Sequence, residues 1–511
     1  MCIFIKKKGL AIIITTLILC SCQNNPKLTY ALECAQENRG ELEKVLDYYK
    51  DEPEKQKAAL FLIENMPFHF SQEEYYYSPL KGKYIPDVTL FANKNAVQKH
   101  CDSLLKKEYQ LIRQKIFDIK YINSEYIINN IELAFSVLHK PWNKNISFED
   151  FCQYILPYRV QNECPSSLRK EMRDKYLPLL DSIQPQNPLE ACSIIHQELK
   201  KIIAYKTTGC PLYPTTEETF RTGLGDCNGL CNLTTIVMRA VGIPVTIDHT
   251  LWTKMNMGHS WCVVLSDRVF YCFNPGETAP GEETNNHFKR YHGIPAKVYR
   301  DRFEPNFNTS INPDINDNYI THLKNVLKQD VTHQYFAPTI QLVTPVEQVF
   351  KNPSPLVYLC TFNSNQWQPL AIGERKKGNY IFENVVGDNI FIIADSPDGS
   401  SLRFVSSPFY VDENGNIRKL VPNKEKTFRY VFPKKKFYLW GKYHLYYWDT
   451  DTQSFTTTQL VEKDEEAWTY EGIPENGLLL FYIPTNNRNR HFFFIEKNDI
   501  KPWKEEMGEN C

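Results

Sequence analysis

The sequence predicts a multidomain α+β protein with an N-terminal helical region, a mixed α+β core and two C-terminal antiparallel β-sandwich modules. Its 511 residues exceed what one hydrophobic core usually organises, so about three or four domains are expected. The hydrophobic pattern also changes twice, from helical spacing to mixed helices and strands near residue 185, and to short alternating strands near residue 338. These changes divide the chain into segments 1–21, 22–184, 185–337, 338–425 and 426–511.

The first 21 residues predict a signal peptide. A basic stretch, Lys6–Lys8, precedes the apolar run LAIIITTLIL, and the run ends in LCSC at Cys22. This resembles a bacterial lipobox, in which the cysteine is lipidated and becomes the first residue. An ordinary secretory signal or a membrane anchor is the alternative, but the run is short for a membrane span. We therefore expect a lipid on Cys22 and a location in the bacterial cell envelope, periplasmic or at the surface, with the membrane contacted through this lipid only.

The charge balance favours neither nucleic acid nor an anionic membrane surface as a partner. The chain has 59 Lys and Arg against 60 Asp and Glu, and no long block of one sign. Fifteen cysteines occur at irregular spacings, which do not form the framework of a small disulfide-rich domain. An oxidising envelope would permit disulfides, but the spacings do not indicate which cysteines would pair.

The segment from Tyr30 to about Gln184 predicts a helical layer. ENRGELEKVLDYYK and PEKQKAALFLIENMP place apolar residues three and four apart, with Pro53 at a first helical position. A later helix ends at Pro157 and leaves Arg159 and Glu163 in a polar turn. We interpret this turn as a buried joint between helices that an Arg159–Glu163 pair holds together.

The sequence GDCNGLCNLTTIVMRAVGIP, residues 225–244, predicts a helix that begins at Cys227. Backbone N–H groups and the positive end of the helix dipole favour a thiolate there, lowering a cysteine pKa from about 8.5. The same N–H groups can stabilise an oxyanion. The inward face of this helix is predicted to consist of Leu230, Leu233, Ile236, Val237 and Ala240.

Two alternating runs after this helix predict a β-hairpin with polar residues at one end. His259 begins GHSWCVVL, 32 residues beyond Cys227, and Asn274 ends RVFYCFN, 15 residues beyond His259. If the runs pair, His259 and Asn274 fall beside each other near one end of the hairpin. Cys227, His259 and Asn274 would then form a nucleophile, a general base and acid, and a group that orients the imidazole.

These residues resemble the core of the transglutaminase-like superfamily, relatives of the papain-like cysteine enzymes. The family motif runs Gly-x-Cys, Arg-x-x-Gly-Ile-Pro, His-x-Trp and an acidic residue before Pro, and here these elements are Gly225–Cys227, Arg239–Pro244, His259–Trp261 and Asn274–Pro275. The resemblance implies that Cys227, and not Cys231, is the nucleophile. Asn274 departs from the usual Asp, because Asn can orient an imidazole but cannot stabilise an imidazolium by charge. Glu277 is the reserve orienter.

A zinc site is the main alternative for the cysteines. It would use Cys227, Cys231, His259 and Cys262, but Cys262 lies three residues beyond His259 on a predicted strand and should point to the opposite face. A disulfide between Cys227 and Cys231 would abolish nucleophilicity. Cys262 and Cys272 are expected on the other face of the hairpin, as small apolar residues and cross-strand neighbours. We therefore predict no metal and no organic cofactor.

Other polar and aromatic residues allow two interpretations each. Trp252 and Trp261 either wall a substrate cleft or pack in the core, and His249 is a weaker candidate for the base. Arg239 is expected to anchor structure. The aromatic residues of the β-sandwich modules are expected in cores, with a glycan-binding platform as the alternative; they include Trp367, Trp440, Trp448 and Trp503.

The predicted function is thiol-dependent acyl transfer or hydrolysis at a peptide or protein amide bond. Hydrolysis is favoured, because transamidation needs a site that excludes water and the sequence shows no such feature. The competing hypothesis is a non-catalytic envelope lipoprotein that binds peptide or glycan through a degenerate core and the β-sandwich modules.

Overall fold

The computed structural model describes residues 25–92, 94–206, 214–253, 258–282, 295–306, 326–347, 354, 356–364, 366–397, 401–433, 444–482, 491–496 and 499–502. The predicted signal peptide and Cys22 lie outside these residues. The chain divides into two compact units. Unit 1 comprises Met1–Thr246, Cys262–Pro280 and Arg302–Pro305, and unit 2 comprises Ile247–Trp261, Gly281–Asp301 and Asn306–Cys511. No helix in the described ranges is both long enough and apolar enough to cross a membrane.

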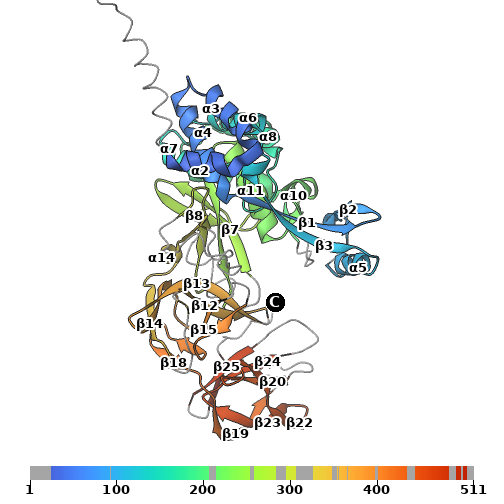
Figure 1. Ribbon diagram of the computed structural model, residues 1–511, viewed down its shortest axis with the longest axis vertical. Coiled ribbons are helices and arrows are strands. Elements are labelled where there is room, and N and C mark those ends of the chain that lie inside the picture. Colours follow the sequence, from blue (N-terminus) through green and yellow to red (C-terminus); the bar gives the residue numbers. More distant parts are fainter. Residues whose placement is uncertain are drawn as a thin grey trace, which may run out of the picture. The chain divides into compact units, whose positions relative to one another are not determined.

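The predicted multidomain α+β architecture is confirmed, with helices in the N-terminal part and antiparallel sheets in the C-terminal part (Figure 1). The helices of unit 1 are α2 (Pro26–Ala35), α3 (Arg39–Tyr48), α4 (Pro53–Asn65), α5 (Lys94–Leu105), α6 (Ser124–Phe135), α7 (Phe148–Tyr154), α8 (Leu168–Ile183), α9 (Pro188–Lys200), α10 (Thr216–Thr222) and α11 (Cys227–Ala240). Four short 3₁₀ helices lie between them: η1 (Gln36–Asn38), η2 (Met66–Phe68), η3 (Val88–Leu90) and η4 (Asp118–Lys120). Pro53 occupies the first turn of α4, as predicted. A backbone N–H at this position would have no acceptor within the helix, so proline loses no hydrogen bond there.

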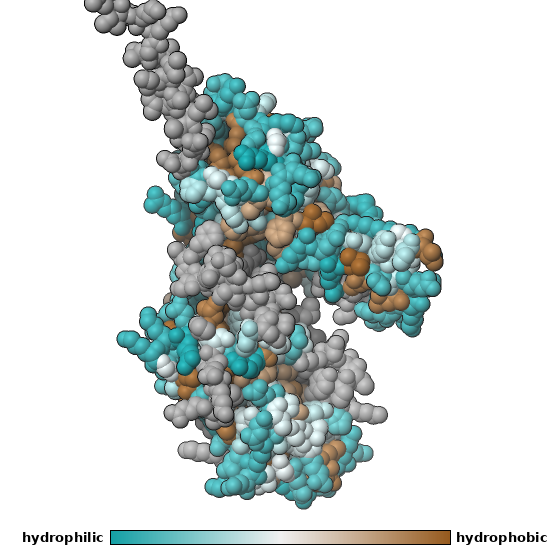
Figure 2. Space-filling model, viewed as in Figure 1, coloured by the Kyte–Doolittle hydropathy of each residue, from teal (hydrophilic) through white to brown (hydrophobic). Residues whose placement is uncertain are grey.

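A three-stranded sheet interrupts the helical layer, which the sequence did not predict. Its strands are β1 (Phe70–Ser78), β2 (Gly82–Tyr84) and β3 (Gln110–Phe117), in the order β2-β1-β3. Only three of the nine residues of β1 are buried, so the strand lacks the alternation that would have revealed it. The sheet and α5 stand apart from the other helices of unit 1 (Figure 1), and Figure 2 shows hydrophobic surface on this part. They share a small core of Tyr76, Val88, Val97, Cys101 and Leu104.

The buried joint after α7 has a different ion pair from the predicted one. Arg159 donates from Nε to Asp118 Oδ2 at 2.6 Å, and both side chains are almost fully buried. The carboxylate of Glu163 instead accepts from Asn232 Nδ2 at 2.7 Å and from the hydroxyl of Thr216. The predicted ion pair between the side chains of Arg159 and Glu163 is therefore wrong, although Arg159 Nη1 does donate to the backbone carbonyl of Glu163 at 2.6 Å. The prediction chose the carboxylate nearer in sequence, that of Glu163, because Asp118 lies in η4, 41 residues before Arg159.

A five-stranded sheet follows α11 in the chain. Its strands are β6 (Val245–Leu251), β7 (Gly258–Ser266), β8 (Val269–Phe273), β9 (Tyr299–Asp301) and β10 (Lys328–Asp330), in the order β10-β9-β6-β7-β8. Strands β6 and β7 each contribute residues to both units. Before α11, the short strands β4 (Ala204–Tyr205) and β5 (Leu224–Gly225) pair in parallel, and α14 (Thr332–Tyr335) follows β10.

The C-terminal part of unit 2 consists of antiparallel strands. The first group is β11 (Ile340–Pro345), β12 (Leu356–Asn363), β13 (Gln366–Lys376), β14 (Asn379–Val385), β15 (Asn389–Asp395), β16 (Arg403–Phe404), β17 (Phe409–Val411) and β18 (Ile417–Lys419). The second group is β19 (Asn423–Pro433), β20 (His444–Asp449), β21 (Ser454–Thr457), β22 (Gln459–Lys463), β23 (Ala467–Glu475), β24 (Leu478–Tyr482), β25 (His491–Glu496) and β26 (Asp499–Pro502).

One apolar core joins side chains from both groups of strands. Trp367 of β13 and Trp448 of β20 are buried in it and meet edge to face, with ring centroids 5.6 Å apart. The expected core position is therefore confirmed for these two residues. Trp440 and Trp503, the other two aromatics considered for glycan binding, lie outside the described residues.

Candidate active site

Helix α11 begins at Cys227, as the sequence predicts. Asp226 is its N-cap, and the Oδ1 atom accepts the backbone N–H of Gly229 at 2.8 Å. The thiol of Cys227 is partly exposed. Four residues of the predicted inward face are buried and Ile236 is partly exposed; the four are Leu230, Leu233, Val237 and Ala240.

The backbone before α11 turns sharply and then pairs, which fixes where the helix starts. Gly223 ends α10 at a φ of 67°, and a Cβ there would lie 2.0 Å from the carbonyl oxygen of Ile202. The pairing of β4 and β5 then holds Gly225, whose carbonyl accepts the N–H of Lys206 at 2.7 Å. Cys227 follows two residues later, so strand pairing and the N-cap locate its backbone together.

Tyr205 lies beside Cys227 and was missed by sequence reasoning. It pairs with Gly225 across β4 and β5 and is 54% exposed. Partial burial and then the negative charges of Cys227 and Asp226 raise the pKa of its hydroxyl. The only signal in the sequence would have been the pairing of two strands of two residues each, which is too short to recognise.

Helix α11 contacts β7 at Cys262, and the backbone beyond the end of the helix, at Pro244, bonds to β7 further along the strand. Cys262 Sγ lies 3.7 Å from the carbonyl oxygen of Cys231, and the N–H of Leu265 donates to the carbonyl of Pro244 at 2.9 Å. Both cysteines are fully buried, and burial raises the pKa of the Cys231 thiol well above its usual value. Cys231 is therefore a core residue, as the sequence predicts.

Neither alternative arrangement of the cysteines is assembled in the described residues. No disulfide joins Cys227 to Cys231. Among the residues that the structure describes, no three His, Cys, Asp or Glu side chains cluster in a way that could hold a metal ion.

The predicted hairpin is present as β7 and β8. Cys262 pairs with Phe273 and Val263 with Cys272, so Cys262 and Cys272 are one position out of register and point to opposite faces. The expectation that they are cross-strand neighbours on one face is therefore wrong. The turn between the two strands sets their register, and the sequence pattern did not define that turn. Cys262 faces α11.

His259 and Asn274 both belong to the open end of this hairpin. His259 precedes Cys262 by three residues on β7, and Asn274 directly follows Phe273 at the end of β8. Cys227 and Asn274 are part of unit 1, whereas His259 is part of unit 2.

The imidazole of His259 lies between two tryptophan rings. It stacks on Trp252 with ring centroids 5.9 Å apart and on Trp261 at 5.7 Å. Both tryptophans are buried, and Trp261 donates from Nε1 to the hydroxyl of Tyr335 at 2.8 Å. Tyr335 in turn donates to Asp248 at 2.6 Å. The expected core position is therefore confirmed for both tryptophans, and their rings also pack on the imidazole of His259. Their role in walling a substrate cleft stays a prediction.

Asn274 is buried in a turn that a second histidine supports. Its N–H donates to Thr278 Oγ1 at 2.9 Å, and the N–H of Gly276 donates to Nε2 of His196 at 3.2 Å. His196 comes from α9 and is itself buried. No local pattern connects it with Asn274, which is 78 residues away. Glu277, the reserve orienter, is exposed in the same turn.

Two residues that the sequence left in secondary roles have structural partners. His249 of β6 lies 3.5 Å from Asp301 and stacks on Tyr299. Arg239 donates to three backbone carbonyls, those of Tyr154, Arg159 and Val245, at 2.9 to 3.2 Å. The prediction that Arg239 anchors structure is confirmed.

Comparisons with known proteins agree with the core motif. Residues 179–275 match the family model described as transglutaminase-like superfamily, which confirms the resemblance for this stretch. One similar solved structure is described provisionally as a cysteine protease from Cytophaga hutchinsonii. It is 14% identical, and the match covers 27% of this chain and 45% of that one with a TM-score of 0.21, too low for any inference. No curated protein matches the chain.

Proposed function

We propose that the chain is a cysteine enzyme that acts on a peptide or protein amide bond, with Cys227 as nucleophile, His259 as general base and acid, and Asn274 as the group that orients the imidazole. The observation that supports this most is the packing of α11 along β7, together with the match of residues 179–275 to the transglutaminase-like model. We also propose, from the sequence, that a lipid on Cys22 anchors it in the bacterial envelope.

Two contacts with β7 indicate how α11 and this strand run relative to each other. Pro244, four residues beyond the C-terminal end of α11, bonds to Leu265, and Cys231, in the first half of the helix, lies against Cys262. The N-terminal end of α11 and the N-terminal part of β7 therefore lie in the same direction from these contacts. One further helical turn advances about 6 Å to Cys227, and three strand residues advance about 10 Å to His259.

The alternation of side chains along β7 limits how His259 could reach Cys227. His259 and Trp261 share one face of the strand, whereas Cys262 lies on the face toward α11. The imidazole must therefore reach Cys227 past the end of the strand rather than through the packed interface. His259 is the second residue of β7, so it lies at that end.

The proposed reaction forms an acyl-enzyme. His259 takes the proton of the Cys227 thiol, and the sulfur forms a bond to the substrate carbonyl carbon. The C–N bond then breaks as the imidazolium gives its proton to the leaving nitrogen. In hydrolysis, water loses a proton to His259 as its oxygen attacks the thioester, and a carboxylic acid and the Cys227 thiol are released.

The oxyanion needs donors other than the N–H of Gly229. That group already donates to the N-cap carboxylate of Asp226. The N–H groups that could stabilise the oxyanion therefore do not include that of Gly229. The proposal places the oxyanion at the backbone of Cys227, before the capped position.

Selective alkylation and activity test the proposal together. The full mature chain is treated with iodoacetamide at several pH values, modified sites are mapped by mass spectrometry, and hydrolysis of a peptide and glutamine-amide library is measured. We expect rapid alkylation at Cys227 and loss of hydrolysis in Cys227→Ala. Cys231→Ala is the matched control, one turn away on the same helix but buried, and it should retain activity.

The competing function, a binding protein without catalysis, predicts other results. Cys227 would then react with the pH dependence of an ordinary thiol, and Cys227→Ala would leave peptide or glycan binding unchanged. Equal loss of activity in Cys227→Ala and Cys231→Ala would contradict the assignment of the nucleophile.

A further inference from the structure

The N-cap residue Asp226 uses most of the backbone N–H groups at the start of α11. Its carboxylate accepts from Gly229 at 2.8 Å, and the N–H of Asn228 also stabilises it. The N–H of Leu230 donates to the backbone carbonyl of Asp226 at 2.9 Å. Of the N–H groups of residues 227–230, three thus interact with Asp226, and the oxyanion of the proposed reaction can take at most that of Cys227.

A second donor to the oxyanion would have to come from a side chain near the helix start. Enzymes that stabilise an oxyanion often combine backbone N–H groups with side-chain donors such as Asn, Ser or Tyr. Asn232 donates from Nδ2 to Glu163 at 2.7 Å, and the hydroxyl of Thr216 donates to the same carboxylate, so both donors hold α10 against α11. In the described part of the chain, no residue hydrogen-bonds to the hydroxyl of Tyr205. This hydroxyl is therefore able to donate to a substrate.

Strand pairing places Tyr205 next to Cys227 within unit 1. Tyr205 of β4 pairs with Gly225 of β5, and the N–H of Lys206 donates to the carbonyl of Gly225 at 2.7 Å. Asp226 continues β5 in an extended conformation, with φ of −75° and ψ of −178°. Neighbouring strands lie about 4.8 Å apart and two residues advance about 6.6 Å, which puts the Cα atoms of Tyr205 and Cys227 about 8 Å apart. A tyrosine side chain can span most of this separation.

The hydroxyl of Tyr205 is both accessible and close enough to the thiol to feel its charge. Tyr205 is 54% exposed and Cys227 is partly exposed, so one substrate can reach both side chains. Burial raises the pKa of the Tyr205 hydroxyl, and among charged groups Cys227 contributes most to the shift, followed by Asp226 and Glu277. A tyrosine whose pKa lies above the ordinary value of about 10 keeps its proton at neutral pH and can donate a hydrogen bond.

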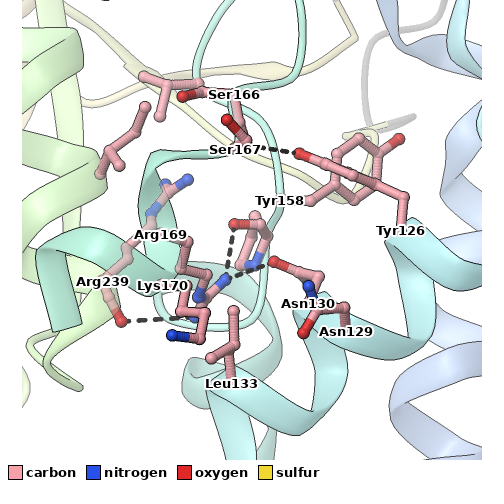
Figure 3. Close-up of a pocket in the computed structure, with 13 residues that line it drawn as sticks. Tyr126, Asn129, Asn130, Leu133, Tyr158, Ser166, Ser167, Arg169, Lys170 and Arg239 are labelled. Atoms are coloured by element: carbon pink, nitrogen blue, oxygen red, sulfur yellow. Dashed lines mark hydrogen bonds between the residues drawn. The ribbon is translucent and has the colours of Figure 1, made fainter. Parts of the chain in front are cut away.

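Buried arginines fix the C-terminal end of α11, so the helix has a defined position before any substrate binds. In Figure 3, Arg169 of α8 lies between Asn130 and the backbone carbonyl of Arg239, and it donates to them at 2.7 and 3.4 Å. The pairing of β4 with β5 fixes the backbone at the other end of the helix. Donors that are held in place before the reaction need little reorganisation as charge develops on the substrate.

We propose that the hydroxyl of Tyr205 is a second donor to the oxyanion, beside the backbone N–H of Cys227. This inference rests on the proposed function. When the Cys227 sulfur bonds to the substrate carbonyl carbon, the π electron pair moves to the carbonyl oxygen, and the O–H of Tyr205 donates a hydrogen bond to it. The tyrosine keeps its proton. As the C–N bond breaks, the electron pair returns to re-form the carbonyl group, and the hydroxyl is released unchanged.

Two small reagents that attack the same thiolate separate this role from a structural one. p-Nitrophenyl acetate acylates a thiolate through a tetrahedral oxyanion, whereas iodoacetamide alkylates it by displacing iodide, without an oxyanion. Both rate constants are measured on the full mature chain at several pH values, with modification of Cys227 followed by mass spectrometry. The melting temperature of each variant shows whether it is folded.

Tyr205→Phe keeps the aromatic ring and removes the hydroxyl. We expect acylation of Cys227 to be slower by about tenfold or more, because one oxyanion donor is lost. The iodoacetamide rate, its pH midpoint and the melting temperature should stay unchanged. Tyr48→Phe is the matched control, since Tyr48 at the end of α3 is also a half-exposed tyrosine of unit 1, 58% exposed, and it should leave both rates unchanged.

The outcomes distinguish this inference from the proposed function. If the wild type is acylated no faster than Cys227→Ala, the proposed function fails and the role of Tyr205 fails with it. If acylation depends on Cys227 but Tyr205→Phe reacts like the wild type, only the role of Tyr205 is overturned. An equal loss of acylation and alkylation in Tyr205→Phe would also overturn it, because the hydroxyl would then act on the thiolate or on the helix start.

Discussion

The negative charge of Asp226 disfavours the Cys227 thiolate that the proposed reaction requires. Removing this charge by mutation therefore gives a quantitative test. Asp226 directly precedes Cys227, and its Oδ1 atom caps Gly229 at 2.8 Å. Asp226→Asn keeps a cap oxygen and removes the charge. Two unit charges 4 Å apart interact by about 4 kcal/mol at an effective dielectric constant of about 20. Because Cys227 is partly exposed, we expect about a third of this, which lowers the thiol pKa by roughly one unit.

The assay is the rate of iodoacetamide alkylation at Cys227 as a function of pH, read by mass spectrometry of the peptide. The midpoint should move to lower pH in Asp226→Asn, with buried Cys231 as an unreactive internal reference. Asp226→Ala should show the same shift and also lose about 1 kcal/mol of unfolding free energy, because the cap is gone. A midpoint that stays in place or rises in Asp226→Asn would refute the electrostatic reasoning.

Three further predictions concern the buried polar groups. Burial raises the pKa of Glu163, so ionisation costs stability as pH rises through that pKa. In urea unfolding, Glu163→Gln should therefore be more stable relative to wild type at pH 8 than at pH 5. An equal difference in unfolding free energy at both pH values would contradict this. Arg159→Met should cost about 3–5 kcal/mol, because Asp118 is left as a buried unpaired charge, and a loss under 1 kcal/mol would be inconsistent with that. His196→Phe should lower kcat with little change in KM, through the turn that holds Asn274; unchanged kcat argues against a positioning role.

Helix α11 and the β7–β8 hairpin could be predicted because their signals are local. The Gly-rich approach and amphipathic run define α11 from Cys227 to Ala240, and alternating runs define β7 and β8. Each of these patterns lies within about 20 residues, so no knowledge of distant contacts was needed.

The missed features depend on contacts between distant segments. Asp118 pairs with Arg159 across 41 residues, and His196 supports a turn 80 residues later at Gly276. Tyr205 reaches the site through a pairing of only two residues per strand. The β1–β3 sheet was hidden because cross-strand ion pairs, such as Arg113 with Glu74 at 2.9 Å, replace an apolar stripe.

The distance from Cys227 Sγ to the nearer ring nitrogen of His259, measured in a crystal structure of the mature chain, tests the central claim most directly. We predict about 3–4 Å, near hydrogen-bond reach, with Asn274 on the other ring nitrogen. A ring held between Trp252 and Trp261 with both nitrogens more than about 6 Å from the sulfur would contradict it, because no proton could then pass directly between them.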